Sequence, residues 1–247
     1  DVLISSSEDP LLFLEYHRQF THSLIFIPFG SLLVSLFCWK LFKHGLNFKE
    51  VYLFCFLGYA THGLLDACTT YGTLLLWPFS DTRFAWNNIS IIDPLLTLPM
   101  LTFVILSITR KTNFFSRVAV IWVVLYLTVG LIQRERAIEA GYEIASSRAH
   151  QPTRLEAKPS FGNTLLWKIV YEQENFFYVD AVRVGITPRV YEGTKTEKLD
   201  LDKHFPWLEI GSQQRKDIKR FHWFSNNYLG IDQNNENKII DIRYSML

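Results

Sequence analysis

The sequence has few cysteines and no excess of charge, and each shortage argues against a class of protein. Its three cysteines, Cys38, Cys55 and Cys68, form no CxxC pair, which argues against a disulfide-stapled secreted domain and for buried free thiols. The 25 basic and 24 acidic residues nearly cancel, so the basic excess typical of a nucleic-acid partner is missing. The sequence lacks a recognisable signal peptide and begins at Asp1 without a methionine, so we expect an N-terminal piece to precede it.

Charge is scarce in the first half of the chain and ordinary in the second. Residues 1–133 contain eight basic and eight acidic residues, whereas residues 134–247 contain seventeen and sixteen. The hydrophobic share of 49% and the mean hydropathy of +0.09 average over this contrast. We therefore expect a membrane-embedded helical domain over 1–133, a helical extension and linker over 134–150, and a soluble β-rich domain over 151–247.

Four apolar stretches lie in the first of these parts. They are Thr21–Trp39, Val51–Thr70, Phe84–Thr109 and Val118–Gln133. A helix that crosses a bilayer needs about 20 mostly apolar residues, and a soluble protein would scarcely hold four such runs in succession. The pattern predicts an α-helical integral membrane protein with about four transmembrane helices in this chain, and more if an N-terminal piece is missing.

The connections between these stretches indicate their orientation. The basic residues of the first and third connections are Lys40, Lys43, Lys49, Arg110, Lys111 and Arg117. Because positive charge concentrates in cytoplasmic loops, we expect these two connections to be cytoplasmic. The C-terminal domain would then lie outside the cytoplasm, although Arg134 and Arg136 on that side count against this orientation.

The C-terminal part has the pattern of a small β-rich domain. Leu165–Tyr171 and Phe176–Gly185 alternate apolar and polar residues and are separated by Glu172–Asn175, which predicts a hairpin. Arg134–Arg148 is typical of a helix that continues out of the membrane. Further β-like or mixed segments are expected at Ile210–Phe224 and Ile239–Tyr244.

His62 and Asp66 lie at the end of the second apolar stretch, four residues apart. On a helix this spacing places both side chains on one face, one turn apart. The pair suits two ligands of one metal ion, or one ligand and the carboxylate that orients it. A histidine that hydrogen-bonds an aspartate in a helical bundle would give the same pattern, so both interpretations stay open.

A second polar cluster, with His17 and His22, precedes the first apolar stretch. Five residues correspond to about 140° around a helix, so the two imidazoles would not share a helical face. We expect His17 in a loop, with Thr21 or Ser23 capping the following helix, so that both rings reach one pocket. Arg18 beside them suits phosphate or carboxylate. The alternative is an interfacial anchor at the level of the lipid headgroups.

Two further charged residues have a place in this interpretation. Asp93 lies inside the third apolar stretch, directly before Pro94, and a carboxylate there faces a partner or a cavity. It suits a metal ligand or an acceptor that orients a ligand histidine. Arg83 lies on the same membrane side and suits contact with an anionic substrate group, or is an ordinary rim arginine.

The blocks that hold these residues resemble a known family. HRQFTHSL, GYATHGLLDACTTYGTLLLWPFSDTRFAW and SIIDPLLTLPML are similar, in order, to motifs of the YdjM-like family of bacterial inner-membrane metal-dependent hydrolases. The resemblance covers about residues 1–105. It implies a multi-pass inner-membrane protein with a His/Asp site for a divalent metal, zinc above all, with one to three ions, and a suggested kinship with zinc-dependent phospholipase C-type folds.

The resemblance also implies which residues form the site. Asp1 falls where the second aspartate of the family's Pro-Asp-x-Asp motif would stand, so at least one more histidine and aspartate are expected beyond this sequence. The metal ligands that the resemblance implies are Asp1, His17, His22, His62 and Asp66, with Asp93 in support. Arg18, Asp66 and Arg83 are the residues expected to take part in catalysis.

These observations favour a membrane-bound hydrolase. A metal-activated water would attack a phosphoester or other ester at the extracytoplasmic membrane surface, in a lipid or lipid-linked substrate. The alternatives are a non-enzymatic metal-binding or transport protein, or an envelope scaffold. A di-iron membrane oxidase is disfavoured because the sequence has no adjacent histidine pair. Membrane lipid is the expected partner, with no nucleic acid.

Overall fold

The computed structural model describes residues 4, 6–42 and 45–244. Its contacts divide the chain into two units. Unit 1 runs to Trp86 and includes Lys216–Asn226; unit 2 comprises Asn87–Arg215 and the residues that follow Asn226. The expected divisions after residues 133 and 150, which were drawn from composition, stay predictions.

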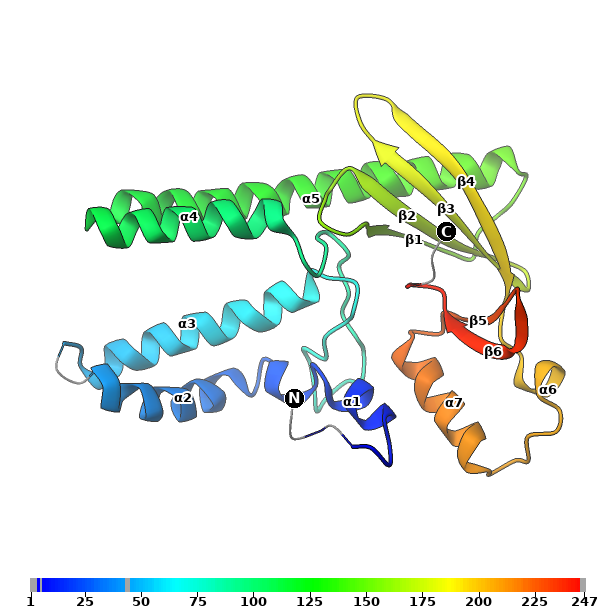
Figure 1. Ribbon diagram of the computed structural model, residues 1–247, viewed down its shortest axis with the longest axis horizontal. Helices are drawn as coiled ribbons and strands as arrows, with labels where there is room; N and C mark the ends of the chain where they lie inside the picture. The colour runs from blue at the N-terminus through cyan, green and yellow to red at the C-terminus, as the bar shows by residue number, and fades with distance from the viewer. Residues whose placement is uncertain (1–3, 5, 43–44, 245–247) are drawn as a thin grey trace. The chain divides into compact units, whose positions relative to one another are not determined.

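Unit 1 is built on a pair of packed helices. Its elements before residue 68 are α1 (Leu11–Tyr16), the 3-10 helix η2 (Phe20–His22), α2 (Ile27–Phe42) and α3 (Phe48–Ala67). Helices α2 and α3 lie side by side (Figure 1). Helix α3 begins with a capping box in which Asn47 and Glu50 each accept a hydrogen bond from the other's backbone N–H. This arrangement satisfies amide groups that the first turn would otherwise leave unpaired.

An irregular segment after α3 joins the parts of unit 1. The Thr73 and Phe84 backbones exchange hydrogen bonds of 3.0 and 2.9 Å, which fold the segment back on itself. The Leu74 amide donates to the Arg18 carbonyl at 3.0 Å, which ties the segment to the α1–η2 connection. The C-terminal part of α7 (Gln213–Phe224) completes the unit, where Phe224 packs edge-on against Tyr71.

Unit 2 contains the longest helix of the described chain. Helix α4 (Pro94–Arg110) and helix α5 (Asn113–Ser147) form an antiparallel pair. Lys111 makes the turn with a left-handed φ of 51°, and the Thr112 side chain caps α5. A Cβ added to Gly130 of α5 would lie 2.3 Å from the Asn88 carbonyl oxygen, so only glycine allows this approach.

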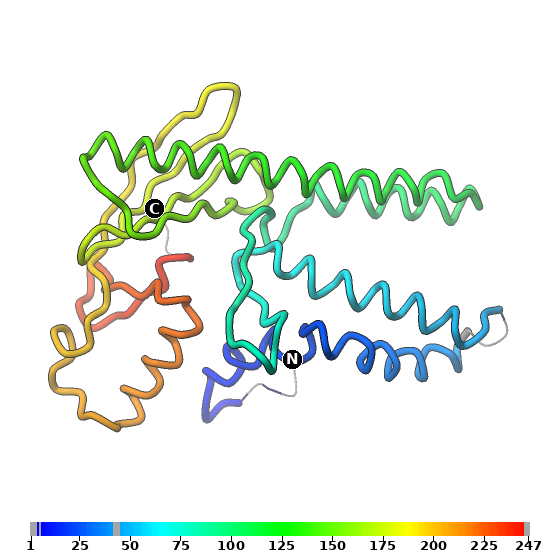
Figure 2. The backbone as a smooth tube through the Cα atoms, turned by 180° about the vertical axis from the view of Figure 1, so that it is seen from behind, coloured from blue at the N-terminus to red at the C-terminus, as the bar shows by residue number. Residues whose placement is uncertain are grey.

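The second half of α5 covers a four-stranded antiparallel sheet. The strands are β1 (Arg154–Pro159), β2 (Leu166–Gln173), β3 (Phe176–Val184) and β4 (Pro188–Glu197), in the order β1-β2-β3-β4. Ala137, Ala140 and Ile144 of α5 pack on Trp167 and Val182 of the sheet. Figures 1 and 2 both show α4 beside one half of α5 and the sheet beside the other.

A smaller hairpin covers other residues of the same sheet. It consists of β5 (Leu229–Asp232) and β6 (Asn235–Asp241), and a short helix, α6 (Leu201–His204), precedes it. Tyr228 and Ile242, which flank the hairpin, are fully buried with Val170, Phe177 and Val179. The sheet therefore has packed residues on both faces. Complete burial of a large apolar side chain contributes about 1.5–3 kcal/mol to stability.

Each expected apolar stretch contains a helix, but two of the helices begin later than expected. Helix α2 starts at Ile27, so neither Thr21 nor Ser23 caps it, and the Ser23 hydroxyl donates to the Phe20 carbonyl instead. Helix α4 starts at Pro94, and the residues from Phe84 to Asp93 are irregular. Among the described residues, α5 is long and apolar enough to cross a membrane. The segments Leu11–His22 and Ile27–Leu41 meet at an angle of 85°, and they add a second span if the bent pair crosses the membrane as one unit. Helix α4 is apolar but shorter than a span of this kind.

The expected C-terminal antiparallel β region is confirmed. Strands β2 and β3 form the predicted hairpin, with the turn narrowed to Glu174 and Asn175. Helix α5 continues to Ser147, as the mixed-charge segment indicated. The expectation of β-like structure at Ile210–Phe224 was wrong: most of this segment is α7, whose apolar residues follow a helical spacing that leaves Phe224 buried.

Candidate metal centre

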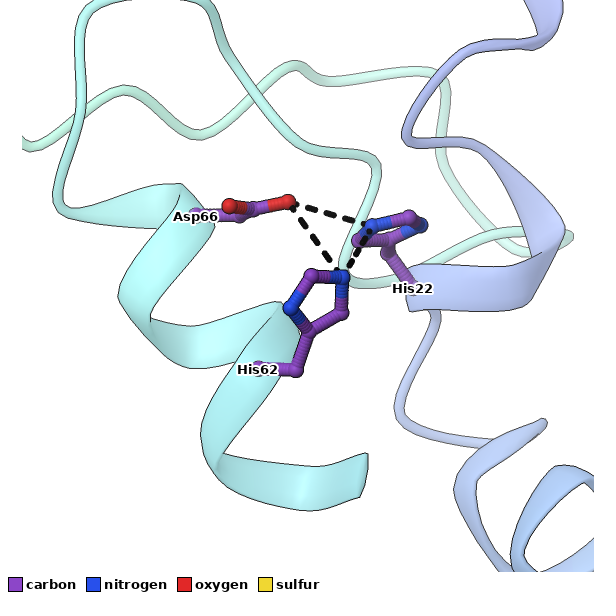
Figure 3. A group of neighbouring side chains, drawn as sticks. All are labelled: His22, His62 and Asp66. Atoms are coloured by element: carbon purple, nitrogen blue, oxygen red, sulfur yellow. Dashed lines mark hydrogen bonds and ion pairs between the residues drawn. The ribbon is translucent and has the colours of Figure 1, made fainter. Parts of the chain in front are cut away.

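Three side chains of unit 1 converge on one point (Figure 3). His22 comes from η2, and His62 and Asp66 come from successive turns of α3. The His22 Nε2 atom lies 3.1 Å from His62 Nε2 and 3.1 Å from Asp66 Oδ2. His62 Nε2 lies 3.8 Å from the same carboxylate oxygen. Two nitrogen donors and one oxygen donor therefore point at a common centre.

The local backbone explains how residues 40 positions apart meet. The chain bends sharply between η2 and α2, so His22 turns away from the axis of α2 and toward α3. Gly63 of α3 permits the approach, because a Cβ there would lie 3.0 Å from the His22 carbonyl oxygen. Contact at that distance is tighter than a side chain normally tolerates. The glycine between His62 and Asp66 is thus what lets η2 lie against this helix.

Arg18 holds the Asp66 carboxylate. Its Nε lies 3.1 Å from Asp66 Oδ2, and its Nη1 donates to Thr69 Oγ1 at 2.8 Å and to the Asp66 carbonyl at 3.2 Å. Arg18 is 6% exposed and adopts a left-handed φ of 58°. The guanidinium is thus ion-paired with the Asp66 carboxylate, and its two hydrogen bonds attach it to the end of α3. Arg18 therefore orients Asp66 within the cluster.

Thr21 sets the orientation of the His22 ring. Its hydroxyl lies 3.0 Å from His22 Nδ1. When that nitrogen carries the proton and donates to Thr21, the Nε2 lone pair is free to face His62 and Asp66. Partners of this kind, on the far nitrogen of a ligand histidine, are usual at metal sites.

His17 lies beside the cluster but outside the three-residue group. Its ring stacks on Phe13 at 4.9 Å, meets Tyr71 edge-on at 5.0 Å and lies 6.5 Å from the His22 ring. Its predicted role as a ligand is not tested by this geometry and stays a prediction.

Arg83 is buried in an aromatic setting. Its Nη2 donates to the Gly72 carbonyl at 3.1 Å, and its guanidinium lies over the rings of Tyr71, Trp223 and Phe224 at 5.7, 5.4 and 5.1 Å. The Arg18 guanidinium also lies over the Tyr71 ring, at 5.0 Å. Tyr71 thus links both arginines to α7, a role that sequence reasoning missed although the block DACTTYG contains the residue.

Two further ligands were predicted, Asp93 and Asp1. Asp93 belongs to unit 2, where it caps α4 by accepting hydrogen bonds from the Leu95 and Leu96 amides, and it accepts a hydrogen bond of 2.8 Å from the Tyr126 hydroxyl. Asp1 lies outside the described residues. Their roles as ligands remain predictions.

The donor set fits a divalent metal ion. Imidazole and carboxylate together suit zinc and similar borderline metals, and His22, His62 and Asp66 each offer a ligand atom within 4.8 Å of the others. The His62 side chain is 62% exposed, against 9% for His22 and 19% for Asp66. The centre is therefore open on the His62 side, where a further ligand can approach.

Two comparisons with known proteins found similar sequences. A family model described as "YdjM inner membrane protein" matches residues 1–137. The chain is also similar to "Inner membrane protein YbcI" of Escherichia coli (strain K12), with 39% identity over 79 residues. That alignment covers 30% of this chain and 44% of YbcI, so less than half of the relative's length is matched. No solved structure matches the chain.

Proposed function

The chain belongs to the YdjM inner membrane protein family, and from this premise we propose that it is a membrane-bound metal-dependent hydrolase. The proposed substrate is a phosphoester or other ester presented at the extracytoplasmic membrane surface, in a lipid or lipid-linked molecule. The four apolar helical stretches would all cross the membrane, with the metal centre and the β region on the extracytoplasmic side.

The observation that carries this proposal is the convergence of His22, His62 and Asp66. Two imidazole nitrogens lie 3.1 Å apart, with a carboxylate oxygen 3.1 and 3.8 Å from them. Lone pairs that face one another at these distances repel unless a proton or a cation lies between them. A divalent ion satisfies all three donors together, whereas one shared proton satisfies two at a time.

The metal and the surrounding residues have separate tasks in this proposal. When bound, a divalent ion lowers the pKa of water toward neutrality and polarises an ester oxygen. Arg18 would orient the Asp66 carboxylate, and the Thr21 hydroxyl would favour the His22 tautomer that presents Nε2. Arg83 would help to position Arg18, because both guanidinium groups lie over the ring of Tyr71. The two arginines also leave positive charge near the centre, which favours an anionic substrate such as a phosphoester.

The exposed side of the centre supports a substrate that arrives from the membrane surface. His62 and Asp66 lie in the last two turns of α3, away from the basic connection that holds Lys40 and Lys49. An edge position of this kind disfavours ion transport, for which the polar groups would be expected near the bilayer midplane.

Metal analysis and hydrolysis of the purified full-length protein test the proposal together. The wild type should retain about one or more equivalents of metal and cleave phosphodiester or phosphomonoester lipids in mixed micelles, with loss of activity after chelation. His22→Ala and Asp66→Ala should lose both the metal and the activity. His204→Ala, a histidine of unit 2 outside the cluster, is the matched control and should keep both.

The outcomes separate the hypotheses. Bound metal without hydrolysis of any ester in the panel would favour a metal-binding or scaffold protein. A wild type that retains no metal, or His22→Ala protein with unchanged metal content, would contradict the assignment of the centre itself.

A further inference from the structure

Two apolar side chains of the β region project from the ends of its loops. Ile186, in the turn between β3 and β4, is fully exposed, and Phe161, in the loop between β1 and β2, is 72% exposed. Single exposed apolar residues are common on protein surfaces. These two differ because both loops are attached to the same end of the α4–α5 pair.

Hydrogen bonds determine where the loops lie along α5. Arg136 donates to the Gly185 and Ile186 carbonyls, and Gln133 donates to the Val184 carbonyl at 2.9 Å. Gln133 also donates to the carbonyl of Thr164, in the β1–β2 loop, at 3.3 Å. The β3–β4 turn therefore lies over the middle of α5, as Figures 1 and 2 both show.

The β1–β2 loop is attached to the start of α4 as well. The Gly162 amide donates to Ser90 Oγ at 3.2 Å, and Pro94 Cδ lies 3.5 Å from the position of a Cβ on Gly162. Phe161 is thus held next to the first residue of an apolar helix. Since α4 and α5 are antiparallel, the start of α4 and the middle of α5 belong to the same end of the pair.

This end corresponds to the edge of the apolar region. The run from Phe114 to Gln133 of α5 holds one charged residue, Arg117, close to its start. Twenty helical residues rise about 30 Å, the thickness of the hydrocarbon layer. Charged residues then follow at once, beginning with Arg134. Loops tied to Gln133 and Arg136 therefore lie at headgroup level if α5 crosses the bilayer.

The charges within the two loops and the strand ends beside them are of one sign. Arg183 and Arg189 pair in register across β3 and β4, three residues on either side of Ile186, and both are exposed. The segments 157–171 and 181–191 contain no acidic residue. Apolar tips flanked by arginines match an interfacial layer of hydrocarbon and lipid phosphate.

We propose that this end of the β region docks on the phospholipid surface, with Ile186 and Phe161 in the interfacial layer and Arg183 and Arg189 on lipid phosphates. The contact would hold the sheet against the bilayer and restrict its rotation about α5. This inference depends on α5 crossing the membrane and is independent of the metal centre.

A depth measurement with the full-length protein tests the proposal. In a variant without native cysteines, Ile186→Cys carries a nitroxide label, and the protein is reconstituted in vesicles of phosphatidylethanolamine and phosphatidylglycerol. The matched control is Glu174→Cys, in the exposed turn at the opposite end of β2 and β3. The label at 186 should collide more with oxygen and several-fold less with a water-soluble nickel complex than the label at 174.

A second variant separates lipid contact from a protein partner. The double substitution Arg183→Glu and Arg189→Glu should move the label at 186 into water, whereas Lys216→Glu with Lys219→Glu, an equal change of charge on α7, should leave it in place. Equal water accessibility of the labels at 186 and 174 would overturn the proposal. An unchanged depth after the double arginine substitution would overturn the assigned role of the arginines.

Discussion

The Nε2 atoms of His22 and His62 lie 3.1 Å apart, although 40 residues separate the two histidines in the chain. Asp66 Oδ2 completes the group, at 3.1 Å from the first and 3.8 Å from the second. One short 3-10 helix and one long α-helix thus place two imidazoles and a carboxylate within reach of a single ion. The predictions that follow concern what holds these helices and side chains in place.

Removal of the metal should destabilise the protein. A ligand that binds only the folded state at 100 times its dissociation constant stabilises that state by about 2.7 kcal/mol. Chelation should therefore lower the unfolding temperature of the detergent-solubilised protein, and addition of zinc should restore it. The Asp66→Ala variant should show neither response, as measured by thermal unfolding with and without chelator. An equal response of this variant would place the metal elsewhere.

Gly63→Ala should weaken metal binding without unfolding α3. The new methyl group would lie 3.0 Å from the His22 carbonyl oxygen, so η2 must shift away and carry the His22 ring with it. We expect a loss of about tenfold or more in metal affinity, comparable to that of other changes that displace a ligand. Isothermal titration with zinc measures it.

The same helix supplies the control for this prediction. Gly58 has no atom within 4 Å of an added Cβ, so Gly58→Ala should leave zinc affinity unchanged and should stabilise the helix by at most about 1 kcal/mol. If both alanine variants bind zinc like the wild type, the close approach at Gly63 is not what positions His22.

Arg18→Gln should lower metal affinity by about 10–100-fold, the usual effect of losing a group that orients a ligand. The variant removes the charge that pairs with Asp66 Oδ2 but keeps a nitrogen at the same position along the side chain as the Arg18 Nε. Thr69→Val, which removes one acceptor of Arg18, should have a smaller effect in the same direction. Zinc titration of both variants checks the order, and a larger effect for Thr69→Val would contradict it.

Asp93→Ala should reduce thermal stability. The carboxylate caps α4 and accepts from Tyr126, and loss of a helix cap costs about 1 kcal/mol. Tyr126→Phe should also lower thermal stability, since it removes the other half of that interaction. Loss of metal from Asp93→Ala, but not from Tyr126→Phe, would in addition identify Asp93 as a ligand.

Acid should destabilise the β region through Glu156. Burial by itself raises the pKa of Glu156, but the neighbouring Lys158 and Arg154 outweigh it and hold the pKa at about 2, against 4.5 for the free side chain. Because the folded-state pKa is the lower one, the stabilisation is fully present above pH 4.5 and is lost as the pH falls toward 2. The shift corresponds to about 3 kcal/mol at most.

Thermal unfolding between pH 6 and pH 3 measures this effect. Glu156→Gln should lower stability at pH 6 and flatten its dependence on pH. The control Glu174→Gln, in the exposed β2–β3 turn, should leave the profile unchanged. A wild-type profile that stays flat down to pH 3 would contradict the depressed pKa.

Much of the local structure follows from sequence patterns alone. Apolar length predicted the positions of α2 to α5, and alternation predicted the β2–β3 hairpin, because both signals depend on neighbours within a few residues. Helix starts were harder: Thr21 and Ser23 are good capping residues, yet the bend after η2 delays α2 until Ile27. At Ile210–Phe224 the mixed pattern suggested β-like structure, whereas contacts with Tyr71 and Arg83 favour a helix.

The sequence by itself determined the residue types of the centre, since the four-residue spacing places His62 and Asp66 on one face of any helix. Only the tertiary structure decided which other residues join them. His22 joins them because the chain bend and Gly63 bring η2 against α3, while the His17 ring stacks on Phe13 and its role as a ligand stays a prediction. Arg18 likewise faces inward to Asp66, a contact set by the fold of a segment distant in sequence and therefore invisible to any local pattern.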